Sequence, residues 1–201
     1  MGLLSGSMND TPHVWFLSVH FREAFWVGAQ RKFLDLYLDV PHTRIFAVEG
    51  IAPEHFTPEE KVLSFSGNHV DGLDLLAKEA LQFAGEDDWL IFCDSDAFPV
   101  SSISGTLASV DALMAVQRLE NLGDPQPHPS FCIAPAGLWR RLQPSWSRGL
   151  TWINNAGHEV TDLGAGVLDA LERSNTSWVK LHRKNQRNLD SLWFGLYGRK
   201  D

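Results

Sequence analysis

The chain has 201 residues, of which 44% are hydrophobic and 21% charged, and this composition fits one compact α/β domain and excludes general disorder. Its 25 acidic and 17 basic residues give a formal net charge of −8, so no nucleic-acid polymer is expected as a partner. A phosphorylated ligand would need a metal cation or a local basic patch.

The cysteine count and the distribution of apolar residues favour a cytoplasmic protein. Only two cysteines occur, Cys93 and Cys132, and both lie in apolar runs, so we expect buried free thiols. No apolar run approaches the ~18–20 residues of a membrane helix, and no transmembrane segment is expected. Residues 1–13 lack the features of a signal peptide and are expected to be a disordered N-terminus or a cloning remnant.

The first half of the chain alternates between apolar runs and amphipathic segments. Strands are predicted over residues 14–19, 44–48 and 89–93, and the last of these is the strongest buried-strand signal in the chain. Helices are predicted over 23–38 and 69–84, with Asn68 or Asp71 near the start of the second. A loop with two prolines is expected over 50–60. This order predicts a parallel sheet with helices on both faces.

The second half of the chain is less regular. Strands are predicted over 113–117, 130–133 and 178–181, a helix over 163–173 and a loop over 121–130. Residues 144–160 show little periodicity. Because no linker rich in proline, glycine or serine divides the chain, residues 14–201 are predicted to form one domain.

The sharpest motif is Asp94-Ser95-Asp96, directly after the buried run 89–93. In an open parallel sheet, ligands bind beyond the carboxyl ends of the strands. Two carboxylates two residues apart in an extended chain point to the same side, and such a pair binds Mg²⁺ or Mn²⁺, which in turn holds a diphosphate. The alternative is a structural turn before Pro99.

The segment from Asp88 to Pro99, Asp-Trp-Leu-Ile-Phe-Cys-Asp-Ser-Asp-Ala-Phe-Pro, resembles the Asp-x-Asp strand of GT-A-fold, nucleotide-sugar-dependent glycosyltransferases. The preceding helix with Asn68-His69 fits the same pattern. Further pieces resemble the acceptor-side half of bacterial members; they are 128–131, Trp139, Trp146, 162–164 and 192–198. The resemblance implies one GT-A-like, Rossmann-like domain with a small antiparallel extension. Residues 14–100 would bind the nucleotide sugar, and 101–201 would meet the acceptor.

The resemblance also implies roles for residues on the donor side. Asp94 and Asp96 would hold Mn²⁺ or Mg²⁺, and Asp94 would also contact the donor. Val19 and His20, at the end of the first strand, would line the nucleotide pocket, although His20 could equally be a satisfied polar residue. Glu49 would touch the base or ribose, or else be a solvated carboxylate. Asn68 would also contact the donor.

On the acceptor side, the resemblance implies that Asp162 accepts the proton of the acceptor hydroxyl as a general base or orients the acceptor. Its alternative is the N-cap of the helix predicted over 163–173. Arg187, in the basic cluster 183–187, would clamp the diphosphate, unless this cluster is a solvated charge run. Trp146 and Trp152 could form a sugar platform or pack in the core.

The sequence departs from the GT-A pattern at one expected metal ligand. Many GT-A enzymes carry a histidine ligand shortly after the Phe-Gly-x-Tyr-Gly stretch, and none follows Gly198 here. The metal would then be held by Asp96 and water alone, or the sequence is truncated, or the site is degenerate. The expected function is metal-dependent transfer of a sugar (the hexosyltransferase class) from a nucleotide-diphosphate donor to an acceptor hydroxyl. The alternatives are a non-catalytic nucleotide- or sugar-binding protein and a metal-dependent nucleotidyltransferase.

Overall fold

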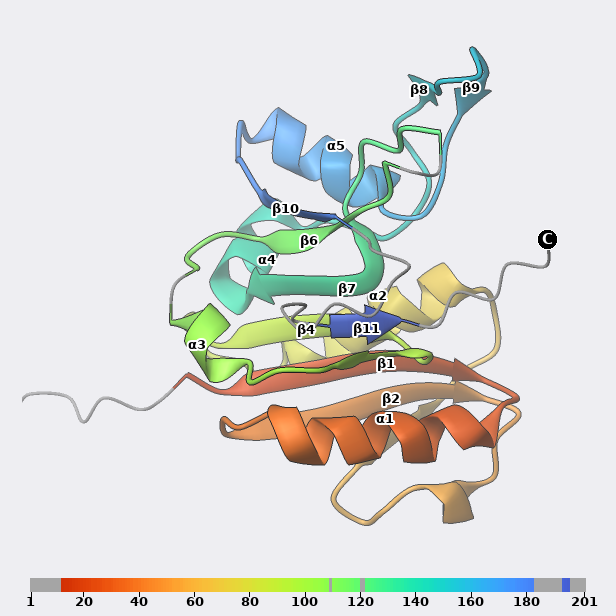
Figure 1. Cartoon of the computed structure of the whole chain (residues 1–201), viewed down its shortest axis with the longest axis vertical. Helices are drawn as coiled ribbons and strands as arrows, with labels where there is room; N and C mark the ends of the chain where they lie inside the picture. The colour runs from red at the N-terminus through yellow and green to blue at the C-terminus, as the bar shows by residue number, and fades with distance from the viewer. Residues whose placement is uncertain (1–11, 109, 120–121, 183–192, 196–201) are drawn as a thin grey trace, which may run out of the picture.

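A computed structural model describes residues 12–108, 110–119, 122–182 and 193–195. Seven strands form a central sheet in the order β10-β6-β7-β4-β1-β2-β3 (Figure 1). Their bounds are β1 Val14–Phe21, β2 His42–Glu49, β3 Lys61–Ser64, β4 Trp89–Asp94, β6 Met114–Gln117, β7 His128–Pro135 and β10 Val179–His182. Neighbouring strands run parallel except at β7, which is antiparallel to both β4 and β6. The mostly parallel sheet predicted from the element order is confirmed.

Helices cover both faces of this sheet. On one face lie α1 (Ala24–Tyr37) and the short α3 (Ser104–Leu107), and the buried residues Leu34 and Ile103 pack there against strand residues such as Phe16. On the other face lie α2 (His69–Ala80), α4 (Ala136–Leu142) and α5 (Ala165–Arg173), whose buried side chains include Leu76 and Leu171. In Figure 1, α1 stands in front of the sheet and α2 behind it.

Two small antiparallel sheets complete the described fold. β5 (Ala97–Pro99) follows the end of β4 after a two-residue turn and pairs with β11 (Trp193–Gly195). β8 (Trp152–Ile153) and β9 (Glu159–Val160) form a hairpin that projects away from the central sheet in Figure 1. The predicted antiparallel extension is thus present. The 3-10 helix η1 (Pro53–His55) lies in the loop predicted over 50–60.

The ends of two helices differ from the prediction. The helix expected over 69–84 ends at Ala80, and the one expected over 163–173 begins at Ala165. The N-cap of this second helix, α5, is Gly164, whose φ of 88° lies in the left-handed region that favours glycine. No side chain caps the helix. The interpretation of Asp162 as the N-cap is therefore wrong. Asn68 does cap α2, because its side chain accepts from the Asp71 amide at 3.2 Å.

Tryptophan and cysteine side chains contribute to the core. Trp146 is fully buried and packs against Phe92 and Trp139, with ring centroids 5.0 and 5.6 Å away. It therefore belongs to the core rather than to a sugar platform. Cys93 and Cys132 are buried and free, as predicted. None of the helices in the described part of the chain is long and apolar enough to cross a membrane.

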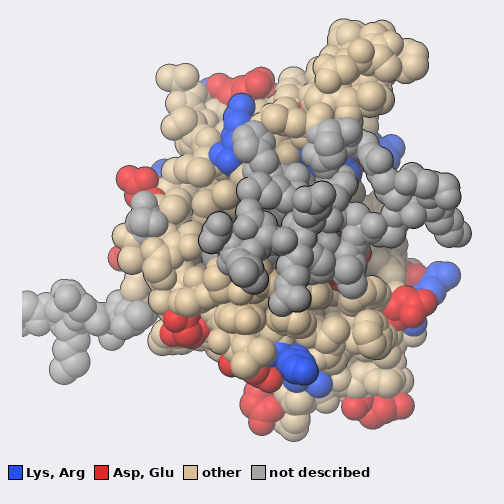
Figure 2. Space-filling model, viewed as in Figure 1, with Lys and Arg blue, Asp and Glu red and all other residues tan. Residues whose placement is uncertain are grey.

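Acidic and basic side chains lie close together on the surface. On the face shown in Figure 2 they form small groups around the margin. Several are local ion pairs, such as Arg22 with Glu49 at 3.2 Å and Arg140 with Glu86 at 2.8 Å. Such exposed pairs contribute little to stability, so the fold depends mainly on its two apolar layers.

Candidate active site

The two carboxylates of the Asp-x-Asp motif lie at the carboxyl edge of the central sheet. Asp94 is the last residue of β4, Ser95 and Asp96 form the turn that follows, and β5 begins at Ala97. Both aspartates are half-buried, and the side chain of Asp94 is 21% exposed. An apolar strand thus ends in charge at the edge where parallel sheets bind ligands.

His69, which was not predicted as a site residue, contacts Asp94. It is the first residue of α2, and its Nε2 lies 3.3 Å from Asp94 Oδ1. Both atoms are shielded from solvent, and neither makes a well-aligned hydrogen bond to a described residue. Buried polar atoms normally have partners, so His69 Nε2 and Asp94 Oδ1 satisfy each other only in part.

The surroundings of the two aspartates separate their acidities. Burial of the Asp94 carboxylate raises its pKa, but the contact with His69 and the electrostatic interactions with His128 and Arg118 together lower that pKa below its ordinary value. Burial and the negative charge of Asp94 raise the pKa of Asp96 to about 6. A divalent cation at this edge would relieve the repulsion between the two carboxylates.

The oxygen atoms at this edge fit a divalent cation whose coordination sphere is completed by a bound ligand and water. Mg²⁺ and ions like it take oxygen ligands and are often held by one or two carboxylates together with substrate phosphates and water. Asp94 Oδ1 is the shielded oxygen that lacks a well-aligned partner. No cluster of three histidine, cysteine, aspartate or glutamate ligands occurs among the described residues. The protein would therefore supply part of the coordination sphere and the bound diphosphate and water the rest.

A hollow of about 520 Å³ opens beside His69. Asn68 and His69 line one part of it, and Ser147, Arg148 and Leu163 line another. The wall therefore combines the first turn of α2 with loops from the second half of the chain. This is the arrangement expected for a site that both halves build.

Asp162 lies next to this hollow and is held by an arginine. Its Oδ2 pairs with Arg118, and its Oδ1 accepts from the Leu163 amide at 2.8 Å. Arg118 also donates to Asp124 at 2.9 Å, and its positive charge acts on Asp94. Arg118, which sequence reasoning missed, thus connects the Asp162 carboxylate electrostatically with the Asp-x-Asp motif.

The side chains of Val19 and His20 are buried. The side chain of Val19 is 1% exposed, pairs in register with Asp94 and packs against Gly72 of α2. His20 is fully buried, and its Nε2 lies 3.2 Å from Oε1 of the buried Gln30. Both side chains thus lie in the interior of the sheet, and the expectation that these residues line the nucleotide pocket stays a prediction.

The remaining residues expected to contact the sugar donor lie at separate places in the chain. Glu49 ends β2 at the same edge as Asp94, pairs with Arg22 and is 25% exposed at its side chain. Asn68 lines the hollow, but its side-chain oxygen is already used as the cap of α2. Arg187 lies outside the described residues.

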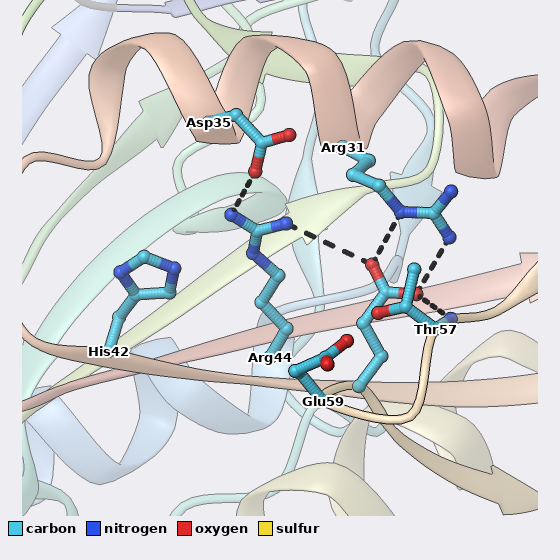
Figure 3. A pocket seen from close by; sticks show the side chains of 7 residues that line it. Arg31, Asp35, His42, Arg44, Thr57 and Glu59 are labelled. Atoms are coloured by element: carbon cyan, nitrogen blue, oxygen red, sulfur yellow. Dashed lines mark hydrogen bonds and ion pairs between the residues drawn. The ribbon is translucent and has the colours of Figure 1, made fainter.

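A second hollow, of about 370 Å³, is lined by an ion-pair cluster near the amino ends of β2 and β3 (Figure 3). Arg31 donates to both oxygens of Glu60, at 2.8 and 2.7 Å, and Arg44 pairs with Asp35 at 2.6 Å. The Glu60 side chain is 2% exposed. These charges compensate one another, so the cluster ties the segment before β3 to α1 and β2.

Comparisons with known proteins support the fold. No protein-family model matches the sequence, and no curated protein matches it. Among solved structures, the chain is similar to a mannosyltransferase from Pyrobaculum calidifontis in complex with GDP-Man and Mn²⁺, with 12% identity and a TM-score of 0.55. The match covers 87% of this chain and 56% of the mannosyltransferase, so the chain spans little more than half of that protein.

Two further structures show the same likeness. The galactosyltransferase LgtC, in complex with donor and acceptor sugar analogs, has 12% identity and a TM-score of 0.51, over 83% of this chain and 72% of LgtC. A mycobacterial protein has 15% identity and a TM-score of 0.53, over 89% of this chain and 68% of its own. The chain therefore has the GT-A fold, as its Asp-x-Asp segment predicted.

Proposed function

We propose that this protein is a glycosyltransferase that moves a sugar from a nucleoside-diphosphate donor to an acceptor hydroxyl with a divalent cation at Asp94 and Asp96. One observation carries the proposal: two half-buried carboxylates lie at the end of the central strand of a GT-A fold and in the turn that follows it, beside a histidine that lacks a well-aligned partner. The mannosyltransferase of similar fold is in complex with GDP-Man and Mn²⁺ in its solved structure.

In this proposal, the residues of the first half bind and orient the donor. Asp94 and Asp96 hold the cation, which is Mn²⁺ or Mg²⁺ and which when bound neutralises the charge of the departing diphosphate. His69 stands beside Asp94, where its ring can donate to a diphosphate oxygen. Glu49 takes the ribose or the base at the neighbouring strand end. Asn68 fixes the start of α2 and thereby the position of His69.

The second half meets the acceptor. Asp162 points its carboxylate toward Arg118, and the ion pair keeps that carboxylate oriented. A carboxylate with hydrogen-bond capacity left on each oxygen can take the proton of an acceptor hydroxyl, which is a general-base role. Arg187 would contact the diphosphate from the basic cluster 183–187. These assignments divide the site between a donor side and an acceptor side.

A binding screen tests the proposal. The protein is heated with a panel of nucleoside-diphosphate sugars, once with Mn²⁺ and once with EDTA, and unfolding is monitored. A ligand at 100 times its dissociation constant adds about 2.7 kcal/mol, which shifts the melting temperature of a 200-residue protein by roughly 5–10 °C. We expect a shift that needs both the cation and a diphosphate, with nucleoside monophosphates as the control. Absence of any metal-dependent shift contradicts the proposal.

Binding without transfer is the second candidate. It is favoured by the engagement of both Asp162 oxygens and by the absence of a third metal ligand among the residues that the structure describes. Donor turnover separates the two functions. A transferase releases nucleoside diphosphate when a hydroxyl acceptor is added, whereas a binding protein keeps the donor intact.

A further inference from the structure

Gln30 is a buried glutamine that reaches from α1 to the turn between β4 and β5. Its side chain is fully shielded from solvent. Its Nε2 donates one hydrogen bond to the Asp94 carbonyl at 2.9 Å and another to the Ala97 carbonyl at 2.8 Å. These two carbonyls bracket Ser95 and Asp96. One amide group therefore ties together both ends of the turn that carries the candidate cation ligands.

His20 fixes the orientation of that amide. Its Nε2 lies 3.2 Å from Gln30 Oε1, and its ring packs edge-on against Phe46 with centroids 5.2 Å apart. Because the amide nitrogen of Gln30 donates to two carbonyls, its Oε1 can only accept, so His20 carries its hydrogen on Nε2. Nδ1 of His20 has no partner among the described residues. Among the described residues, the hydrogen bond of the His20 ring is therefore the one to Gln30.

Packing alone gives no reason for a glutamine at this position. Gln30 lies on the buried stripe of α1 together with Val27 and Leu34, where an apolar side chain would fill the space. Burying an amide is costly unless its hydrogen bonds are made. The buried amide nevertheless occurs at the residue that reaches the Asp94-Ser95-Asp96 turn. A second buried polar residue, His20, completes its hydrogen bonds.

We propose that Gln30 is a positioning residue for the cation site, and that His20 acts through it. The inference rests on the proposed function. A cation that takes two carboxylates from one turn needs them held to within about half an ångström, and the hydrogen bonds of Gln30 set the distance between the two ends of that turn. Loss of the clamp would leave both aspartates present but wrongly spaced.

Four variants of the full chain test this proposal. Gln30→Met removes both hydrogen bonds at similar volume. His20→Leu removes the support of Gln30, whereas His20→Gln keeps an N–H donor near the position of Nε2. Leu171→Ala is the control, because it truncates the core under α5 without touching the turn. Two quantities are measured: the dissociation constant of GDP and of UDP with Mn²⁺ by calorimetry, and the hydrogen-exchange rates of the amides at 94–97.

We expect Gln30→Met to raise the dissociation constant at least tenfold and to speed exchange in the turn at least tenfold. His20→Leu should give the same changes to a smaller extent, and His20→Gln should restore both. Leu171→Ala should lower the melting temperature while leaving affinity within twofold. A role confined to stability would instead move the melting temperature of all variants and the affinity of none.

Other results overturn the proposal. A folded Gln30→Met protein with unchanged affinity would show that the clamp does not position the ligands. If Gln30→Met does not fold, the two His20 variants decide, and equal affinity in both contradicts the role of His20. If the wild-type protein binds neither nucleotide with Mn²⁺, the proposed function fails, and unchanged exchange in the variants would then also rule out the clamp.

Discussion

His69 Nε2 lies 3.3 Å from Asp94 Oδ1 and joins the first residue of α2 to the last residue of β4. The contact depends on β3, because the parallel pairing of β3 with β2 brings the chain back to the carboxyl edge just before α2 begins. The site thus combines a carboxylate on a strand with a ring on a helix terminus, and each can be tested separately.

Asp96→Ala should abolish cation-dependent nucleotide binding and leave the fold intact. The half-buried side chain lies in a turn, and its removal relieves the repulsion with Asp94, so we expect stability to change by no more than about 0.5 kcal/mol. Calorimetry with GDP and Mn²⁺ measures the binding, and circular dichroism checks the fold. A variant that unfolds, or one that binds like the wild type, would refute the assignment of Asp96.

His69→Leu should weaken binding of the nucleoside diphosphate about tenfold or more. A hydrogen bond to a charged group contributes roughly 1.5–3 kcal/mol, and the leucine cannot make one. The same titration measures the effect. His158→Leu is the matched control, since this histidine is exposed in the loop of the β8–β9 hairpin. Equal affinities in the two variants would remove His69 from the site.

Asp162→Asn should leave donor affinity unchanged and slow sugar transfer at least ~100-fold, the lower end for loss of a general base. The amide keeps the shape of the side chain but cannot accept the proton. Initial rates at saturating donor and acceptor measure the effect. Asp169→Asn, on the solvent side of α5, controls for charge. Unchanged turnover would reduce Asp162 to a structural partner of Arg118.

Glu60→Ala should destabilise the protein without affecting nucleotide binding. The carboxylate is buried between Arg31 and Arg44, and its removal takes the carboxylate partner from the half-buried Arg31, whereas Arg44 keeps Asp35; breaking a buried ion pair costs about 3–5 kcal/mol. We expect a melting temperature lower by roughly 10 °C. Glu59→Ala removes an exposed neighbouring carboxylate and should cause no comparable drop. Similar shifts in both variants would contradict the cluster's role.

Stability should fall with acid in a window set by His20. Burial lowers the pKa of His20 from its ordinary value of 6.5 to about 4. Between pH 6.5 and pH 4, the histidine is therefore protonated in the unfolded chain but neutral in the folded chain. The free energy of unfolding should therefore decrease as pH falls from about 6.5 to about 4, by roughly 3 kcal/mol from this group. The raised pKa of Asp96 acts in the opposite sense.

The contribution of His20 is isolated by difference. Urea unfolding at several pH values is compared between the wild type and His20→Gln, which has no titrating ring but keeps a donor to Gln30. The free-energy difference between the two proteins should change through this window and stay constant above pH 7. A difference that does not change with pH would show that the histidine is not held neutral by the fold.

The sequence predicted those parts of the site that are encoded by neighbouring residues. A buried apolar run followed at once by two aspartates identified both the strand and the edge where Asp94 lies. His69 was missed as a site residue because β3 is a four-residue strand that alternates between half-buried and exposed positions after a proline-containing loop. Without that strand, the sequence could not place the start of α2 beside β4.

Other features could not be predicted because they depend on contacts between distant residues. Gln30 looks like one polar residue in an amphipathic helix, and its partners lie 64 and 67 positions away. His20 was expected at the ligand because it ends a strand at the correct edge, but strand position does not reveal burial. Arg118 contacts Asp124 and also Asp162, which lies 44 positions further along a part of the chain with weak periodicity.

The pairing of β4 with β7 has a consequence for synthesis on the ribosome. When the chain has emerged as far as Asp94, the strands β1, β2 and β3 can pair, but one edge of β4 stays open until β7 arrives. That edge is a run of apolar residues from Trp89 to Cys93, a template for contact with other nascent chains. At about 5–20 residues per second, the 41 residues from Asp94 to Pro135 take roughly 2–8 s. Fragments that end near residue 100 should therefore aggregate, even though they contain every residue expected to contact the donor or its cation except Arg187.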